Sequence, residues 1–506
     1  MKLLRSALGI LTACLLMHSA SAKILPAPPF TDHAVLQRDV AVPVWGWDET
    51  PGATVTVAYR GQTKEARVNQ SGLWRADLDA LPATAEGTDL IITGSSTVTL
   101  RDVVVGEVWL ASGQSNMEWP LQNSRGYDEE KSLPANPLIR HLKIARSPAD
   151  LPVSVVKTDG WQTASPATIG NFSGIGYFFA RHLTEKLNVP VGIMHASWGG
   201  TPIESWLPEP VLRNTRAWPA FNAGWQQALQ EFPKKYAEQP ALEAAWQQAE
   251  VDFRTTGKPI TMPWPRPPMG PGSAYAPGRL FNGMIAPLAP YALRGVLWYQ
   301  GESNVGHHGD YRELLPAMIQ AWRTAWPQGD FPFLLVQLPN FSDNNPTGRA
   351  WAQLREAQES ALHVPATGMA VIIDGDEPDN LHPVNKRPVG ERLALIALHQ
   401  IHDQRTLEWS GPVVQSVQTE GAAIRVKFSH AAGLALRSAA PTGFEVAGGD
   451  KVFHAATAQI SGDSVLVSAT AVSAPVAVRY AWTNSPAASV YNSAGLPAAP
   501  FRSDNW

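Results

Sequence analysis

Residues 103–120, VVVGEVWLASGQSNMEWP, decide the fold of this chain. The first half is apolar, β-branched and aromatic with no helical spacing of polar residues, which predicts a central strand buried on both faces of a parallel sheet. The small and polar residues 111–116 then favour a sharp turn toward a helix. Ser115 is therefore predicted at the carboxyl end of a strand, where open α/β sheets bind ligands. A plain Ser/Gly turn explains this segment equally well until the rest of the chain is considered.

The composition is typical of a globular protein with several domains. The chain has 506 residues, of which 44% are hydrophobic and 17% are charged. A formal net charge of −4 provides no basic field for a phosphate backbone, so we expect no nucleic-acid partner. The 43 prolines and 40 glycines predict many loops and short strands, and the 19 tryptophans predict flat apolar surfaces in the core or in a sugar-stacking cleft.

The N-terminus is typical of a secretory signal peptide over residues 1–22. Two basic residues precede an apolar segment at 7–17, and a small-residue cleavage pattern ends at Ala22. The segment is too short to span a bilayer, and lipoprotein-type cleavage at Cys14 is the weaker alternative. Because cleavage after Ala22 removes the single cysteine, the mature chain would have no disulfide or thiol site. We expect a periplasmic or secreted protein that is not held at a membrane.

The remaining chain divides into three predicted units. Residues 23–101 alternate short β-rich runs with turns, which predicts a small antiparallel β-sandwich, and residues 406–506 predict a second one. Residues 102–405 alternate strand and helix patterns, which predicts a parallel sheet covered by helices. An insertion at about 208–277 has a helical first part and a Pro/Gly-rich second part; a helical hairpin over the cleft and a surface appendage are equally good expectations. The expected strands are 189–198, 294–299, 331–338 and 369–373, and the expected helices are 176–187, 311–326, 350–362 and 388–400.

Two further residues complete the groups that a serine nucleophile requires. Such a nucleophile needs a base and an acid that orients the base. His382 and Asp379 lie in the loop after the expected strand 369–373. The Asp-x-x-His spacing allows the carboxylate to reach the ring Nδ1 and leaves Nε2 for the Ser115 hydroxyl.

Two other strand ends offer donors for the negative charge that develops on a carbonyl oxygen. The expected strand 189–198 is followed by Gly199 and Gly200, whose amides can approach a substrate without a Cβ in the way. The expected strand 294–299 is followed by Asn304, whose side-chain amide can donate.

Acidic residues also cluster in the loop before His382, at Asp374, Asp376 and Glu377. Their spacing lacks the glycine and the terminal glutamate of an EF-hand loop, so a solvated acidic loop is favoured over a calcium site and we expect no metal.

In this order, the four strand ends carry Ser, Gly, Asn and Asp-x-x-His, and the chain resembles the SGNH hydrolases, most closely the sialate O-acetylesterase-like carbohydrate esterases. The matching stretches are VLQR at 35–38, GQSNM at 113–117, SWGGT at 197–201, FNGMIAPL at 281–288, WYQGESN at 298–304 and Asp379-x-x-His382-Pro383. The resemblance implies a flavodoxin-like SGNH domain with flanking antiparallel β modules, acting without a cofactor. Met117 stands where the Gly-x-Ser-x-Gly elbow of α/β-hydrolases has its second glycine, which favours the SGNH fold.

The resemblance also implies residue roles. Ser115 would be the nucleophile, His382 the general base and then acid, and Asp379 its orienting carboxylate. The oxyanion donors would be the Ser115 backbone N–H, the Gly199 N–H, with Gly200 as the alternative, and the Asn304 side chain.

Candidate substrate-binding residues are chosen from their nearness to these groups in sequence. They are Gln300, Glu302 and Trp198, and His307 and His308 are alternatives to His382 as the base.

The favoured function is removal of O-acetyl groups from an oligosaccharide or glycan, of sialic acid or hemicellulose type, through an acetyl-enzyme. A lipase or thioesterase with the same chemistry is a second hypothesis. A non-catalytic carbohydrate-binding protein built from the two β-sandwiches is the third.

Overall fold

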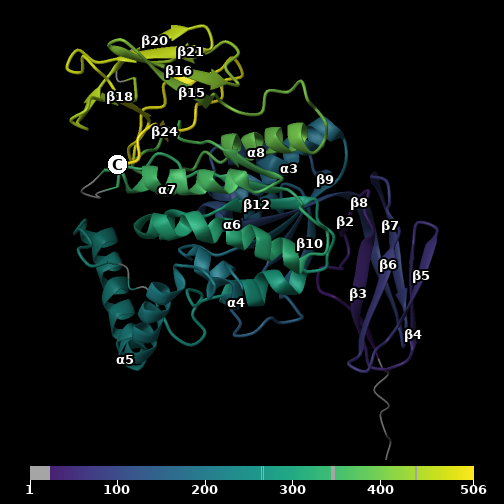
Figure 1. Ribbon diagram of the computed structural model, residues 1–506. Helices are drawn as coiled ribbons and strands as arrows, with labels where there is room; N and C mark the ends of the chain where they lie inside the picture. The colour runs from purple at the N-terminus through teal and green to yellow at the C-terminus, as the bar shows by residue number, and fades with distance from the viewer. Residues whose placement is uncertain (1–22, 264, 266, 344–347, 439–441) are drawn as a thin grey trace, which may run out of the picture.

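The computed structural model describes residues 23–263, 265, 267–343, 348–438 and 442–506. A central α/β unit lies between a β-rich unit at the N-terminal end and another at the C-terminal end (Figure 1). The predicted signal peptide at 1–22 lies outside the described residues.

The strand at the centre of the sheet is β8 (Thr97–Gly113). Its second half pairs in parallel with β11 (Val191–Ser197) on one side and β12 (Gly295–Tyr299) on the other. Every residue of β8 from 103 to 113 is buried, which confirms the prediction of a central strand covered on both faces.

The rest of the central sheet extends outward from these three strands. The order along it is β10-β9-β11-β8-β12-β13-β14, with β10 antiparallel to β9 and the other neighbours parallel. The outer strands are β9 (Asn136–Ile144), β10 (Thr158–Ala164), β13 (Phe333–Val336) and β14 (Thr367–Ala370). The protein is therefore a mixed α/β protein, and its β-rich ends are antiparallel apart from residues 35–37, which pair in parallel with β8.

Helices cover both faces of the central sheet. Trp109 of β8 packs edge-on against Phe179, with ring centroids 5.0 Å apart, and Trp298 of β12 packs edge-on against Trp322 at 5.7 Å. Because Trp109 pairs with Gly295, three positions before Trp298, the two tryptophans point to opposite faces of the pleated sheet. The helices are α3 (Gly174–Leu187) and α8 (Arg387–Gln400) on the Trp109 face, and α6 (His308–Ala325) and α7 (Ala350–Glu359) on the Trp298 face. A short helix, α2 (Tyr127–Ser132), lies between β8 and β9 in the chain.

The last parallel strand is shorter than predicted at its carboxyl end. β14 ends at Ala370, whereas the apolar run continues through Ile373. Ile373 is fully buried in the hydrophobic core of the C-terminal unit, against a cluster that includes Val446 and Val478. The apolar residues after Ala370 are therefore explained by packing against the C-terminal unit and not by pairing in the sheet.

The N-terminal unit shares β8 with the central sheet. The first half of β8 pairs antiparallel with β7 (Thr84–Thr93), so the expected division between residues 101 and 102 falls inside one continuous strand. The remaining strands are β1 (Ile24–Pro26), β2 (Val35–Gln37), β3 (Val42–Asp48), β4 (Thr54–Tyr59), β5 (Gln62–Arg67) and β6 (Leu73–Leu78). One hydrophobic core runs through both units. The strand β8, which leads to Ser115, is therefore packed against residues of both units.

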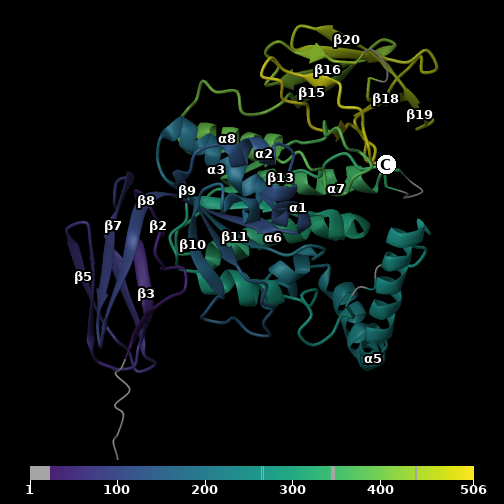
Figure 2. The ribbon, with the colours of Figure 1, turned by 180° about the vertical axis from the view of Figure 1, so that it is seen from behind.

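The C-terminal unit has a separate hydrophobic core and sits beside α7 and α8 (Figure 2). Arg355 of α7 is fully buried and donates to the carbonyls of Thr483 and Asn484, which joins the two units. One antiparallel sheet contains β15 (Val413–Glu420), β16 (Ala423–Ser429), β20 (Thr457–Ser461) and β21 (Ser464–Ser468). The other contains β18 (Phe444–Ala447), β19 (Phe453–Ala455), β22 (Ala477–Tyr480) and β24 (Phe501–Arg502), and a short pair joins β17 (Ala435–Leu436) to β23 (Val490–Tyr491).

The insertion after β11 is mostly one bent helix. A short α4 (Glu209–Leu212) precedes α5 (Trp218–Thr256), which contains Pro233 and Pro240. Figures 1 and 2 show α5 as two arms that meet at a bend, in place of the expected hairpin of two helices. Proline removes an N–H from the helix and its ring clashes with the preceding turn, which kinks a helix in this way. Among the residues that the structure describes, no helix combines the length and the hydropathy needed to cross a bilayer.

Candidate active site

Ser115 lies at the carboxyl end of β8, as the sequence predicts. Gly113 has a φ of +132°, and a Cβ at this position would lie 2.0 Å from the carbonyl oxygen of Tyr299. Only glycine fits this turn. It leads directly into α1 (Ser115–Glu118), whose first residue is the serine. The N–H groups of a first helical turn have no partner within the helix, so the Ser115 N–H is available to a ligand.

The loop after β14 brings His382 to Ser115. The distance from His382 Nε2 to Ser115 Oγ is 2.8 Å, although the residues are 267 positions apart. Trp119 stacks on the imidazole with ring centroids 5.4 Å apart and planes 21° apart. Geometry therefore provides a hydroxyl and a base in direct contact, with the ring held on one face.

The surroundings of His382 keep its imidazole neutral. Burial lowers the pKa of His382 below its usual 6.5, and the positive charge of Lys386 lowers it further. A neutral imidazole can accept the serine proton near neutral pH, which a general base must do.

Asp379 does not contact His382. Its side chain is exposed, and no hydrogen bond joins it to the imidazole among the described residues. The role of Asp379 in orienting His382 therefore stays a prediction, which this arrangement of the loop does not support. The loop turns so that the Asn380 side chain accepts from the His382 backbone N–H at 3.0 Å, while Asp379 faces solvent.

A buried polar network holds the His382 loop against α1. The Asn116 side-chain amide donates to Glu302 Oε1 at 2.6 Å and to the Leu381 carbonyl at 3.1 Å, and Lys386 Nζ donates to Asn116 Oδ1. Burial raises the pKa of Glu302 and lowers the pKa of Lys386 to about 7. The sequence does not predict a role for Asn116 or Lys386, although Asn116 belongs to the GQSNM stretch at 113–117 and Lys386 lies four residues after His382.

The Gly199 amide, predicted as an oxyanion donor, already has an acceptor. Its N–H donates to Glu118 Oε2 at 2.8 Å, and Arg146 Nε donates to the other oxygen of that carboxylate at 2.8 Å. A Cβ on Gly199 would lie 3.1 Å from the Ser115 Cβ, so the backbone passes directly beside the nucleophile. Gly200, the alternative oxyanion donor, lines the same cavity as Ser115.

Asn304 is buried and is not among the residues that line the cavity beside Ser115. It is 1% exposed, its amide donates to Glu204 Oε2 at 2.9 Å, and its carbonyl accepts from the Ile203 N–H and from Gln300 Nε2. Its role as an oxyanion donor stays a prediction, since Glu204 takes only one of the two hydrogens of this amide. Its polar atoms bind the loop after β11 to the loop after β12.

Ser115 and His382 open into a cavity of about 960 Å³. Two of the predicted substrate-binding residues, Glu302 and Trp198, line it, and Arg146 lies over the Trp198 ring at 5.4 Å. Gln300 is fully buried, donates to the Thr201 carbonyl and is not among the residues that line this cavity, so its binding of substrate stays a prediction.

The alternative bases and two unpredicted polar residues are also placed by the structure. His307 has a 72% exposed side chain, and neither it nor His308 is among the residues that line the cavity. Gln114 and Ser303 do line it, and the sequence analysis did not assign them a role. Both lie next to residues that it singled out.

The insertion forms one wall of this cavity. Phe232 and Tyr236 of α5 line it, with ring centroids 5.3 Å apart, and Tyr275 and several prolines follow from the loop after α5. The insertion therefore borders this cavity, as one bent helix and a proline-rich loop. Flat aromatic side chains are suited to contact with sugar rings.

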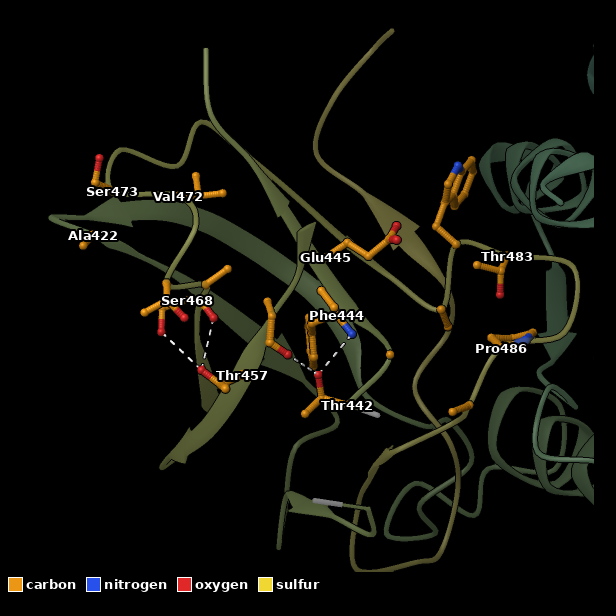
Figure 3. Close-up of a pocket in the computed structure, with 18 residues that line it drawn as sticks. Ala422, Thr442, Phe444, Glu445, Thr457, Ser468, Val472, Ser473, Thr483 and Pro486 are labelled. Atoms are coloured by element: carbon orange, nitrogen blue, oxygen red, sulfur yellow. Dashed lines mark hydrogen bonds between the residues drawn. The ribbon is translucent and has the colours of Figure 1, made fainter. Parts of the chain in front are cut away.

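A second cavity, of about 850 Å³, lies in the C-terminal unit (Figure 3). Its Thr442 hydroxyl donates to the Ala456 carbonyl and its Thr457 hydroxyl donates to the Ser468 carbonyl. The described residues that line it include no histidine, in contrast to the Ser115 cavity.

Comparison with known proteins gives one consistent family. The family model described as carbohydrate esterase, sialic acid-specific acetylesterase, matches residues 105–259 and 251–399. The sialate O-acetylesterase of Rattus norvegicus is 29% identical over 524 residues, covering 93% of this chain and 92% of the rat protein. That of Homo sapiens is 29% identical over 422 residues, covering 76% and 72%. The crystal structure of a carbohydrate acetylesterase from Xanthomonas citri aligns with a TM-score of 0.81 and 36% identity, covering 96% of this chain and 100% of that one.

The exposed position of Asp379 gives a first prediction. Asp379→Asn should keep kcat for p-nitrophenyl acetate within about threefold of wild type, because no hydrogen bond to the base is lost. A triad that depends on this carboxylate would lose about 10⁴-fold in kcat. The exposed Asp403→Asn serves as the matched control, and a loss in Asp379→Asn near the triad value would contradict the observed geometry.

The surroundings of His382 give a second prediction, for the pH dependence. Because the pKa of His382 is lowered, the acid limb of kcat/KM should lie below pH 6.5. Lys386 has a pKa of about 7 and is therefore charged where His382 titrates. Lys386→Met removes this positive charge. The imidazolium of His382 is then more stable, so the acid limb should move to higher pH. Lys427→Met on the C-terminal unit should leave the limb in place, and an unmoved limb in Lys386→Met would contradict the assignment.

Proposed function

This chain belongs to the family of carbohydrate esterases described as sialic acid-specific acetylesterases, and we propose that Ser115 and His382 carry out its removal of O-acetyl groups from carbohydrates. The observation that carries this assignment is the 2.8 Å contact between His382 Nε2 and Ser115 Oγ at the base of a large cavity. Family membership favours this activity over the lipase or thioesterase alternative and over a non-catalytic carbohydrate-binding protein.

The proposed reaction has two displacements. His382 Nε2 takes the proton of Ser115 as Oγ attacks the acetyl carbonyl carbon, and the C=O π electrons move to the carbonyl oxygen. The tetrahedral intermediate collapses when the bond to the sugar oxygen breaks, and His382 gives its proton to that oxygen. Water then attacks the acetyl-enzyme with His382 again as base, which releases acetate and restores the Ser115 hydroxyl.

The orientation of His382 is proposed to come from packing and the loop rather than from a carboxylate. Trp119 stacks on the ring, and Asn116 holds the carbonyl of Leu381, the residue before the histidine. These contacts fix the loop on α1, so Ser115 and His382 are proposed to work as a dyad.

The substrate is proposed to be an acetylated oligosaccharide or glycan. The cavity of about 960 Å³ is at the large end of the range for ligand pockets, and its wall includes Trp198, Phe232 and Tyr236. These flat side chains support stacking on sugar rings beside the scissile ester. Acetate release from acetylated sialic acid, xylan and xyloglucan would identify the preferred glycan.

The finer organisation is part of the same proposal. We assign residues 102–405 to a flavodoxin-like SGNH domain, with β modules at 23–101 and 406–506. The parallel order of the central sheet and the helices on both faces support this assignment. Export to the periplasm or the exterior is proposed from the signal-peptide pattern at 1–22.

The nucleophile is tested by Ser115→Ala. This change should abolish p-nitrophenol release from the acetate ester and labelling by a fluorophosphonate, because it removes the oxygen that attacks the acetyl carbonyl. Ser71→Ala in an exposed turn of the N-terminal unit is the control and should keep full activity. Activity that survives in a folded Ser115→Ala protein would rule out the proposal.

The role of the insertion wall is tested by Tyr236→Ala. The side chain of Tyr236 is on the cavity wall and the residue is 64% exposed, so its loss should leave the fold unchanged. Loss of one stacking contact should raise KM for an acetylated oligosaccharide by about 3–10-fold, with kcat for p-nitrophenyl acetate unchanged. The control is Leu242→Ala on the same helix, 46% exposed and outside this cavity. Equal KM values in Tyr236→Ala and wild type would remove α5 from the binding site.

A further inference from the structure

The donors expected to stabilise the tetrahedral intermediate are largely engaged elsewhere. The Gly199 N–H binds the Glu118 carboxylate and the Asn304 amide binds the Glu204 carboxylate. The backbone N–H groups of Ser115 and Gly200 remain, and each further donor matters, because removal of a single donor from an oxyanion hole typically costs about 10²–10³-fold in kcat. Another donor is therefore needed beside the nucleophile.

Gln114 has such a donor. It is the residue before Ser115, it is 3% exposed, and it lines the same cavity. Its Oε1 accepts from the backbone N–H of Gly301 at 3.4 Å and of Ser303 at 3.3 Å. These two donors identify which end of the Gln114 amide is the oxygen, so the other end is the nitrogen Nε2. No acceptor for Nε2 is found within the described part of the chain.

The amide is also held in place before a substrate binds. A Cβ on Gly301 would lie 2.8 Å from the side chain of Leu354, so the loop that anchors Gln114 Oε1 is packed against α7. Fixed donors stabilise a developing charge better than mobile ones, because they need no reorganisation during the reaction. The Ser303 hydroxyl lines the cavity too, but it rotates freely about its Cβ–Oγ bond.

We infer that Gln114 is a catalytic residue, whose Nε2–H donates to the carbonyl oxygen as it becomes negative, together with the Ser115 backbone N–H. The inference rests on the proposed nucleophilic role of Ser115. The Gln114 amide stabilises both tetrahedral intermediates, since the acetyl carbonyl oxygen occupies the same place in acylation and deacylation.

Two substitutions separate donation from anchoring. Gln114→Glu keeps an oxygen acceptor for the Gly301 and Ser303 N–H groups and removes the NH₂ donor, whereas Gln114→Met removes both without adding charge. Donation predicts that both variants lose about 10²–10³-fold in kcat for p-nitrophenyl acetate, with KM within about threefold of wild type. Loss in Gln114→Met alone indicates an anchoring role, and loss in Gln114→Glu alone indicates a charge effect; either result overturns the inference.

A measurement on the wild-type protein keeps the inference testable if the variants do not fold. In a crystal structure of the enzyme phosphonylated on Ser115, the phosphonyl oxygen should lie about 2.7–3.1 Å from Gln114 Nε2. A distance beyond hydrogen-bond range overturns the role of Gln114. Failure of Ser115 to react at all, or activity in Ser115→Ala, would instead refute the proposed function, so the two failures are distinguishable.

Discussion

The contact between Ser115 Oγ and His382 Nε2 depends on the parallel alignment of β8 with its neighbours. β8 lies between β11 and β12, and all three end at the same edge of the sheet, so the loops that follow them meet around Ser115. The β14 strand, two positions beyond β12, delivers His382 to the same edge. Because the first half of β8 is also part of the N-terminal unit, that unit stabilises the strand that leads to Ser115.

Buried polar groups beneath the contact set its electrostatics. Asn116 links Glu302, Lys386 and the Leu381 carbonyl, so a carboxylate, an ammonium group and the His382 loop share one amide side chain. Unpaired buried charges are costly, and this bridging arrangement compensates part of that cost. Burial and the charge of the same lysine lower the pKa of His382, so the imidazole is neutral near neutral pH.

The regions outside the central sheet contribute in different ways. The insertion supplies aromatic side chains to the cavity from α5, whereas the C-terminal unit is attached through the buried Arg355 and carries its own cavity (Figure 3). The aromatic wall of the cavity is thus on a segment that is separate from the strand ends that carry Ser115 and His382. Such a division allows the wall to change without disturbing the reacting groups.

The sequence by itself determined the central strand, the positions of Ser115 and His382 at strand ends, and the helices on the sheet, because periodicity and turn residues are local signals. It did not determine where Asp379, Asn304 and Gln300 point. Neighbouring residues of one loop cannot be told apart from the sequence, although Ser303 lines the cavity and Asn304 is buried. Only the tertiary structure decided this, since a side chain's direction depends on which distant carboxylates, carbonyls and rings are packed around it.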